Sequence, residues 1–206
     1  MGDSPLNLLI FLGSVREHRM ATRVGRYMQN LLEKRGHTVT LVDPREHNLG
    51  EVQQPLHFYA DPTAAPAILH KINKQILEAD GFVIVSPEYN SGMAPALASI
   101  MDNFSPQSYA YRPAAIVTYS MGQFGGIRAA MQLRQFLSEL NLVHMPSMIV
   151  ISKVHEALSE EGERKVADGQ LQRASDAMCK QFEWYANALR KARKAEPGPV
   201  LGHWAQ

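Results

Sequence analysis

The stretch Asn7-Leu-Leu-Ile-Phe-Leu12, followed by Gly13-Ser14, decides the fold class. A short, continuous apolar run that ends at a small-residue turn is typical of a strand buried on both faces, as in a parallel sheet. The next segment repeats apolar residues at helical spacing from Ala21 to Leu32, and Lys34-Arg35-Gly36 ends it with two cations and a glycine. A buried strand followed directly by a helix is the first unit of an α/β fold.

The same alternation repeats along the chain. Further strands are predicted at residues 38–42, 81–86, 114–119 and 148–151, and further helices around residues 68–76, 95–104, 130–140 and 171–189. Residues 49–66 are predicted to form a loop. Strands that alternate with helices favour a doubly wound, five-stranded parallel sheet with helices on both faces. We expect a single domain over residues 1–194 and a C-terminal tail over residues 195–206, whose apolar end, residues 201–204, would dock on the domain or on a partner subunit.

The composition limits the classes of function. The 206 residues carry 21 Lys and Arg against 20 Asp and Glu, and this net charge of +1 argues against a dedicated nucleic-acid-binding protein. The longest apolar runs fall far short of the about 20 residues that cross a bilayer, so no membrane span is expected. The single cysteine, Cys179, cannot form an internal disulfide, so a cytoplasmic location is expected. The eight histidines lack metal-ligand spacing, and no metal site is expected.

Doubly wound sheets bind ligands at the carboxyl ends of their strands, so the turns that follow the strands are the candidate sites. The first turn, residues 13–22, leads into the first helix, whose N-terminus offers free backbone N–H groups and the positive end of the dipole. Ser14 and Thr22 add hydroxyl donors, and Arg16 and Arg19 add positive charge. This chemistry favours a phosphate monoester, which arginine can bind through two hydrogen bonds. The alternative is a solvated turn with surface arginines.

The first turn matches neither of the standard nucleotide-binding motifs. It lacks the G-x-x-x-x-G-K-[ST] pattern of a P-loop and the G-x-G-x-x-G pattern of a dinucleotide site. Asp43 follows the second strand, where the ribose-binding acid of a dinucleotide site would lie. Without the glycines, an aspartate that starts a loop is the favoured interpretation.

The second turn, residues 86–95, has the composition of a site for a planar ring. Pro87 ends the strand, and Gly92 allows the backbone to approach a ligand closely. Tyr89 offers a flat face, and Asn90 offers both donors and an acceptor. We interpret this turn as a surface for a planar heterocycle, with an ordinary strand-to-helix connection as the alternative.

The third turn, Ser120-Met-Gly-Gln-Phe-Gly-Gly126, places three glycines before a helix and supplies further backbone donors. A hydrolase is the alternative here, because the run around Ser120 is similar to the G-x-S-x-G nucleophile elbow. Thr118 replaces the first glycine of that motif, and no histidine is placed as an obvious partner. The hydrolase interpretation is therefore disfavoured.

Together the three turns resemble those of the NADPH-dependent FMN reductase family, the flavodoxin-like quinone reductases. The matching pieces are L-G-S-V-R at 12–16, P-E-Y-N-S-G at 87–92 and S-M-G-Q-F-G-G at 120–126, and the resemblance covers about residues 8–151. It implies a flavodoxin-like sheet with strand order 2-1-3-4-5 and FMN bound across the strand ends. It also implies NADPH or NADH as the reductant, and assembly into a homodimer or homotetramer.

The resemblance also implies roles for individual residues. It assigns the FMN phosphate to the first turn, the isoalloxazine ring to the second turn, and the other side of the ring to the third turn. Arg19 would serve either the FMN phosphate or the 2′-phosphate of NADPH. The implied cofactor-binding residues are Gly13, Ser14, Arg16, Arg19, Met20, Ala21, Thr22, Pro87, Glu88, Tyr89, Asn90, Ser91, Gly92, Ser120, Met121, Gly122, Gln123, Gly125 and Gly126.

The implied reaction is a ping-pong reduction. Hydride would pass from NAD(P)H to flavin N5 and then to a small-molecule acceptor such as a quinone, an azo compound or a metal ion. The flavin would carry this chemistry, so no catalytic side chain is expected. The alternative is a non-enzymatic protein of the same fold, either an electron carrier or a redox-sensing interaction module.

Overall fold

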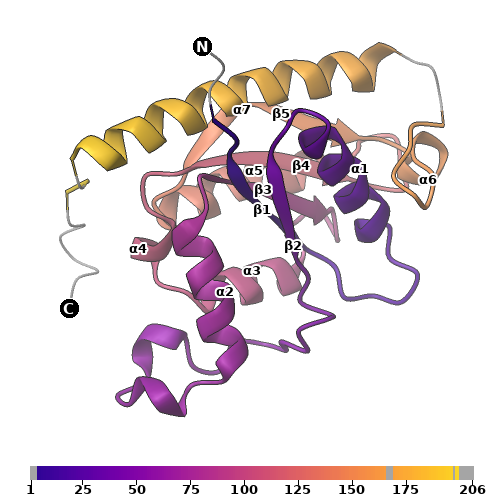
Figure 1. Ribbon diagram of the computed structural model, residues 1–206. Coiled ribbons are helices and arrows are strands. Elements are labelled where there is room, and N and C mark those ends of the chain that lie inside the picture. The colour runs from indigo at the N-terminus through magenta and orange to yellow at the C-terminus, as the bar shows by residue number, and fades with distance from the viewer. Residues whose placement is uncertain (1–3, 166–168, 197, 200–206) are drawn as a thin grey trace.

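The computed structural model describes residues 4–165, 169–196 and 198–199, and five parallel strands form its sheet in the order β2-β1-β3-β4-β5 (Figure 1). The strands are β1 Asn7–Leu12, β2 Thr38–Val42, β3 Gly81–Pro87, β4 Pro113–Tyr119 and β5 Val143–Ile151. The helices are α1 Ala21–Glu33, α2 Ala67–Glu78, α3 Pro95–Asp102, α4 Pro106–Tyr109, α5 Ile127–Glu139, α6 Val154–Ala157 and α7 Gly169–Ala195. The prediction of a flavodoxin-like α/β fold, including its strand order, is confirmed.

The sheet separates two hydrophobic cores, because alternate residues of each buried strand face opposite sides. In β1, Ile10 packs into the core under α1 and α7, whereas Phe11 packs into the core under α2, α3 and α5. The central strands β3 and β4 are buried along their whole length. Figure 1 shows α1 and α7 on one side of the sheet and α2 and α3 on the other. The continuous apolar runs of the sequence therefore have the physical origin that was predicted for them.

Several boundaries differ from the prediction. β5 begins at Val143 rather than at residue 148, and it contains Pro146. This proline is tolerated because β5 is an edge strand, where a missing N–H leaves no partner unpaired. The predicted loop at 49–66 contains the short 3-10 helices η1 Leu56–Phe58 and η2 Pro62–Ala64. The short helices α4 and α6 were not predicted, since one helical turn carries too little periodicity to detect.

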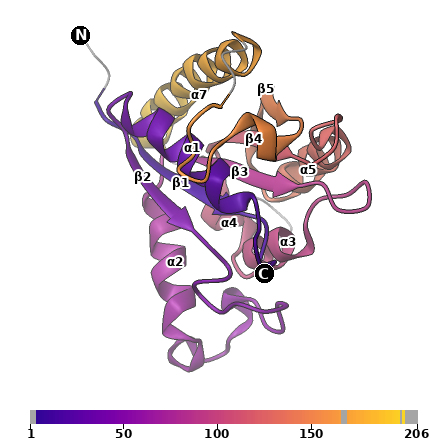
Figure 2. The same cartoon turned by 90° about the vertical axis from the view of Figure 1, so that its right-hand side faces the viewer.

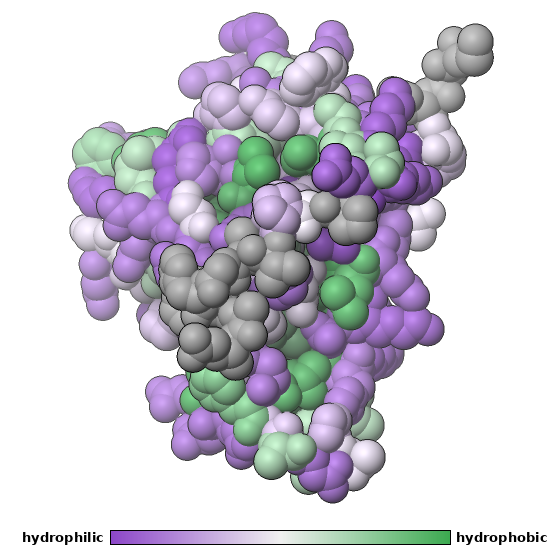
Figure 3. Space-filling view, turned by 90° about the vertical axis from the view of Figure 1, so that its left-hand side faces the viewer, coloured by the Kyte–Doolittle hydropathy of each residue, from purple (hydrophilic) through white to green (hydrophobic). Residues whose placement is uncertain are grey.

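The carboxyl ends of the strands lie on the side where Figure 1 shows α6, because α6 follows β5 closely; Figure 2 views the molecule from this side. The opposite edge, near α4, is shown in Figure 3. Where grey atoms do not cover it, that edge is largely hydrophilic, with apolar side chains in separate small groups. Within the described ranges, no helix is both long and apolar enough to span a membrane.

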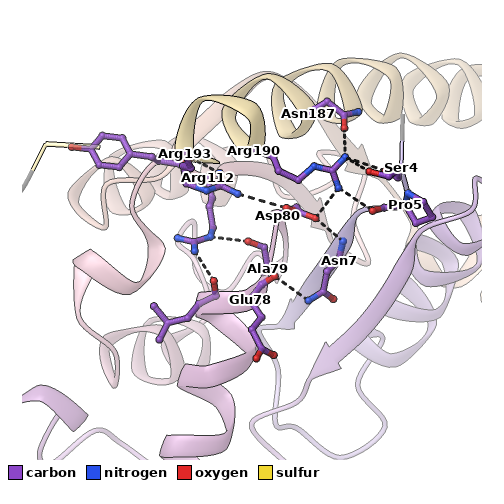
Figure 4. Close-up of polar contacts among 12 residues, drawn as sticks. Ser4, Pro5, Asn7, Glu78, Ala79, Asp80, Arg112, Asn187, Arg190 and Arg193 are labelled. Atoms are coloured by element: carbon purple, nitrogen blue, oxygen red, sulfur yellow. Dashed lines mark hydrogen bonds and ion pairs between the residues drawn. The ribbon is translucent and has the colours of Figure 1, made fainter. Parts of the chain in front are cut away.

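A polar network holds the amino edge of the sheet together (Figure 4). The Asp80 carboxylate accepts a hydrogen bond from the Asn7 backbone N–H and forms ion pairs with Arg190 and Arg193 of α7. The Arg112 guanidinium donates to the carbonyl oxygens of Leu77 and Ala79, at the C-terminal end of α2. Buried arginine is stable here because backbone carbonyls at helix ends satisfy its donors.

The end of the chain is described only in part. α7 ends at Ala195, which is the first residue of the predicted tail. The Tyr111 hydroxyl donates to the Pro199 carbonyl oxygen at 2.6 Å, so this part of the tail contacts the domain. The predicted docking of residues 201–204 lies outside the described residues, and the division into domain and tail stays a prediction.

Candidate active site

The three turns chosen from the sequence meet around one cavity of about 530 Å³ at the carboxyl ends of β1, β3 and β4. Its lining residues are Arg16, Glu17, His18, Arg19, Met20, Pro87, Glu88, Tyr89, Tyr119, Ser120, Met121 and Gly122. A second cavity of about 450 Å³ lies between β5, α6 and α7, and none of the three turns lines it. The chemistry predicted from the sequence therefore gathers at the first cavity.

The N-terminus of α1 faces this cavity without a side-chain cap. The residue at the capping position is Met20, whose side chain has no oxygen to accept from the first helical N–H groups. Those groups carry the partial positive charge of the helix dipole and favour an anion. This uncapped N-terminus is consistent with the anion site that the sequence of the first turn predicts.

Tyr89, from the second turn, joins the first and second turns. Its hydroxyl lies 2.6 Å from the Ser14 Oγ, within hydrogen-bond distance. The Arg16 guanidinium lies over the same ring, 3.6 Å from the ring centroid, in a cation–π contact. Ser14 is buried and Arg16 is exposed, so one aromatic side chain engages both the inner and the outer polar group of the first turn.

Arg19 is held within the protein. Its guanidinium forms a two-pronged ion pair with the Asp43 carboxylate and also donates to the Ser14 carbonyl oxygen at 2.5 Å. Both side chains of the ion pair are more than nine-tenths buried. Asp43 also accepts from the Arg45 backbone N–H, as expected for an aspartate that starts a loop. In this structure Arg19 fixes the path of the first turn, and its donors are directed at protein oxygens.

The second turn is a tight hairpin. Tyr89 and Gly92 exchange two backbone hydrogen bonds, and the residues between them, Asn90 and Ser91, have φ values of 50° and 67°. Two left-handed residues in succession are typical of a type I′ turn, in which asparagine is favoured. The Gln132 side chain of α5 accepts a hydrogen bond from the Met93 backbone N–H, and this bond ties the hairpin to α5.

Glu88 links the second turn to α5. Its carboxylate accepts from the backbone N–H groups of Arg128 and Ala129, at 3.0 and 3.4 Å, and from the Arg128 side chain at 2.8 Å. A carboxylate at this position satisfies the first N–H groups of the helix and complements its dipole. The N-terminus of α5 is therefore occupied by a protein carboxylate, whereas that of α1 has no side-chain cap.

The glycines of the third turn are required by its packing. Gly125 and Gly126 have φ values of 61° and 89°, and a Cβ at either position would lie under 3.0 Å from Val150 or Thr118. The Ser120 hydroxyl donates to the Gly122 carbonyl oxygen. This contact gives no support to the hydrolase alternative.

The predicted site residues divide into two groups. Nine of them line the cavity. The others lie behind or beside it, in the buried floor (Gly13, Ser14, Ala21), in the first turn of α1 (Thr22), at the hairpin tip (Asn90, Ser91, Gly92) or in the rest of the third turn, where Gly125 and Gly126 are buried and Gln123 is exposed. Glu17, His18 and Tyr119 line the cavity but were not predicted. Tyr119 immediately precedes the third turn, and its position at a strand end was the signal that could have found it.

A family model described as NADPH-dependent FMN reductase matches residues 6–156, which include all three turns. The chain belongs to this family. The NADPH-dependent FMN reductase assignment makes it an oxidoreductase, with FMN as its cofactor and NAD(P)H as its reductant. This confirms the predicted enzyme class over the alternative of a non-enzymatic carrier.

Individual relatives agree with the family assignment. An NADPH azoreductase of Bacillus sp. (strain OY1-2) is 23% identical over 158 residues, which cover 77% of this chain and 83% of that protein. A quinone reductase of Escherichia coli (strain K12) is 41% identical over 83 residues, 39% of this chain and 44% of that protein. The flavoenzyme NAD(P)H:(acceptor) oxidoreductase of Paracoccus denitrificans has a similar fold, with a TM-score of 0.69 at 20% identity over 87% of this chain and 98% of that one.

Proposed function

We propose that this FMN reductase passes electrons from NAD(P)H to a small-molecule acceptor, such as a quinone or an azo compound, by a ping-pong mechanism. The observation that carries the proposal is the single cavity at which all three turns meet, at the position where doubly wound sheets bind their ligands. The names of the two relatives, an azoreductase and a quinone reductase, support this class of acceptor.

The described residues fit the phosphate of FMN. The N-terminus of α1 lacks a side-chain cap, Arg16 supplies positive charge, and the Tyr119 hydroxyl is buried without a hydrogen-bond partner among the described residues. All three features lie in or beside the first turn and match the donors that a phosphate monoester needs. We infer that Ser14, Arg16, Met20, Ala21 and Thr22 hold this phosphate, with Met20 and Ala21 contributing backbone N–H groups.

The second and third turns fit the flavin ring. Pro87 and Glu88 line the cavity from the second turn, and the Glu88 carboxylate is engaged at the N-terminus of α5. Met121 and Gly122 line the cavity from the third turn. Within the described chain, their backbone N–H groups form no hydrogen bond. We infer that these N–H groups face the ring edge where negative charge develops on reduction and stabilise it there.

The chemistry that bound FMN supplies is two-electron transfer in two half-reactions, first with NAD(P)H and then with the acceptor. The protein's part is to bind and orient, so no side chain needs to act as a nucleophile or a general acid. Both substrates would use the same face of the cavity in turn, which requires that the first product leave before the acceptor enters.

The test begins with the visible absorption spectrum of the purified protein, supplemented with FMN and followed anaerobically after NADPH is added. We expect a flavin band that bleaches with NADPH and returns when a benzoquinone is added. Initial rates measured against NADPH concentration, at several fixed benzoquinone concentrations, should give parallel lines in a double-reciprocal plot. Intersecting lines would contradict the ping-pong mechanism, and a flavin band that NADPH does not bleach would contradict the reductase.

We also propose that the enzyme assembles into a homodimer or homotetramer and works in the cytoplasm. The apolar side chains of Met121, Phe124, Ile127 and Met131 are each 39% or more exposed beside the site, which supports an assembly that covers them. The single, buried cysteine agrees with a reducing compartment.

A further inference from the structure

The Tyr119 hydroxyl is a buried polar group that the protein leaves unpaired. The side chain is only 4% exposed, and its hydroxyl has no hydrogen-bond partner among the described residues. A buried donor without a partner destabilises the folded protein, because it loses its hydrogen bonds to water and gains none in exchange. Burial, followed by the neighbouring Tyr89, raises the pKa of Tyr119 well above its ordinary value, so the group stays a neutral donor.

The position of this hydroxyl is set by β4. Tyr119 is the last residue of that strand, pairs with Pro87 in the sheet and points toward the side covered by α1. Its hydroxyl lies near Tyr89, Arg16, Arg19 and the Ser14 hydroxyl, which is close enough to lower its pKa. The contact with Ser14 does not have the geometry of a hydrogen bond, so the Tyr119 hydroxyl has no partner among the described residues. Three hydroxyl groups, those of Ser14, Tyr89 and Tyr119, therefore lie together beneath the N-terminus of α1.

The other polar groups of this cluster already have partners. Ser14 and Tyr89 are bonded to each other, and the Arg19 guanidinium is bound by Asp43. Only the Tyr119 hydroxyl of this cluster lacks a partner among the described residues, and it lies beside the uncapped N-terminus of α1 and the exposed Arg16. A ligand oxygen would complete the donor set, and an anionic oxygen would suit it best.

We propose that Tyr119 is a further ligand-binding residue, whose hydroxyl donates a hydrogen bond to an oxygen of the phosphate monoester held at the first turn. The proposal rests on the proposed function for the identity of that ligand as FMN. It makes Tyr119 a determinant of selectivity for FMN over riboflavin, which has the same ring system but no phosphate.

This role predicts opposite effects of one substitution on the two states of the protein. Tyr119→Phe removes a hydroxyl that is unpaired without ligand, so the apoprotein should be as stable as the wild type or slightly more stable. With FMN, the same change removes one hydrogen bond to a charged group. We expect FMN affinity to fall about tenfold, the size of one such bond.

The experiment measures flavin binding to the full-length apoprotein by quenching of flavin fluorescence, with FMN and riboflavin titrated separately. Tyr119→Phe should weaken FMN about tenfold and leave riboflavin unchanged. The matched control is Tyr109→Phe. Tyr109 is also buried, but its hydroxyl donates to the Met101 carbonyl oxygen away from the cavity. This control should lower the melting temperature of the apoprotein and leave the affinity for both flavins unchanged.

Three results would overturn the proposal: an unchanged FMN affinity in Tyr119→Phe, an equal loss of FMN and riboflavin, or a clear loss of apoprotein stability. The last would show that the hydroxyl already has a partner without ligand. If the wild type binds no FMN, the proposed function fails, and inorganic phosphate then tests Tyr119 alone. Phosphate should raise the melting temperature of the wild type more than that of Tyr119→Phe, and equal rises would reject the role.

Discussion

The contacts of Tyr89 explain how two distant turns form one site. The Tyr89 hydroxyl is within hydrogen-bond distance of the Ser14 Oγ, and the Arg16 guanidinium stacks on the Tyr89 ring. Tyr89, which follows β3, therefore contacts the polar side chains that follow β1. Both partners are groups that we assign to the FMN phosphate. A bound phosphate would therefore compete with Tyr89 for Ser14 and Arg16. The affinity for the phosphate then depends on how far the Ser14 hydroxyl and the Arg16 guanidinium turn away from Tyr89 and toward the ligand.

Replacing Arg16 with alanine tests the phosphate assignment directly. Loss of a charge-assisted hydrogen bond should weaken FMN binding by about 1.5–3 kcal/mol. Fluorescence titration of the apoprotein measures the change. Arg26→Ala is the matched control, because Arg26 is an exposed arginine of α1 that donates to the Glu160 carbonyl oxygen, away from the cavity. Equal FMN affinities for Arg16→Ala and wild type would remove Arg16 from the phosphate site.

What the sequence could predict at the residue scale depended on local signals. The glycines and hydroxyls of the three turns are local features, and they predicted turns that the structure brings together around one cavity. The pairing of Arg19 with Asp43 joins residues 24 positions apart. It could not be derived from the chain, because both residues also had plausible solvent-exposed roles. The unpaired hydroxyl of Tyr119 likewise depends on what surrounds it in three dimensions.

At the scale of single elements, the N-termini of α1 and α5 differ in whether a side chain caps them. Both follow a turn at the carboxyl edge of the sheet, and both begin without a cap from the preceding residue. The Glu88 carboxylate accepts hydrogen bonds from the N-terminal N–H groups of α5. The N-terminal N–H groups of α1 have no side-chain cap, so their partial positive charge is available to a ligand. This difference supports the proposal that the anion binds at the first turn rather than at the third.

Replacing Glu88 with alanine should remove the cap of α5. The free energy of unfolding should fall by about 0.5–2 kcal/mol, the ordinary loss for a helix cap. Urea denaturation of the apoprotein measures it. Glu139→Ala is the control at the other end of α5, where a negative charge does not complement the dipole, so its removal should not lower stability. A stability loss no larger in Glu88→Ala than in Glu139→Ala would contradict the capping role.

Helix α7 is joined to the segment between α1 and β2 by an ion pair that responds to pH. Glu183 accepts two hydrogen bonds from Arg35 and lies 3.1 Å from the His37 ring nitrogen. Burial alone would raise the pKa of Glu183, but the hydrogen bonds from Arg35 and His37 outweigh it and lower the pKa below its ordinary value. Folding therefore favours the ionised carboxylate, whose contribution to stability is present above the ordinary glutamate pKa.

Glu183→Gln should accordingly be less stable than the wild type at pH 7, by about 1 kcal/mol for a partly exposed ion pair. The difference should persist down to the ordinary glutamate pKa and shrink as the pH falls through the lower pKa of the folded state. Denaturation curves at neutral and acidic pH measure it, with the exposed Glu33→Gln of α1 as control. A difference that stays constant as the solution is acidified would show that the carboxylate charge is not the cause.

The elements themselves were largely predictable, because most of them express a single periodicity. Strands buried on both faces read as continuous apolar runs, and the long helices repeat apolar residues at their own spacing. β5 was predicted too short because Pro146 and the half-buried residues around it interrupt the apolar run. Its early part is held as an edge strand by pairing with β4, which is a tertiary effect.

In the whole molecule, the amino and carboxyl ends of the strands have different roles. The amino edge is fixed by the ion pairs of Asp80 with α7 and by the carbonyl contacts of Arg112. The carboxyl edge carries the three turns whose residues line the cavity. Binding groups placed on loops that a rigid scaffold positions are a common arrangement in proteins. It explains how a site built from three turns keeps its geometry.

The proposed assembly follows from the apolar residues that this edge leaves exposed. Phe124, Ile127 and Met131 are 56%, 39% and 44% exposed. Ile127 and Met131 are four residues apart and share one side of α5, whereas Phe124 lies in the third turn that precedes this helix. Covering them with a second subunit would bring that subunit next to the flavin site. Light scattering should therefore give two or four times the 23.0 kDa of one chain.

The double substitution Phe124→Ser/Ile127→Ser should shift that mass toward the monomer, because it removes apolar area that only assembly covers. Leu77→Ser is the control: Leu77 is 50% exposed on α2, outside the candidate surface, and its loss should leave the mass unchanged. A wild type that is monomeric at micromolar concentration would reject the assembly itself. A double variant with the mass of the wild type would keep the assembly but place its interface elsewhere, away from α5 and the third turn.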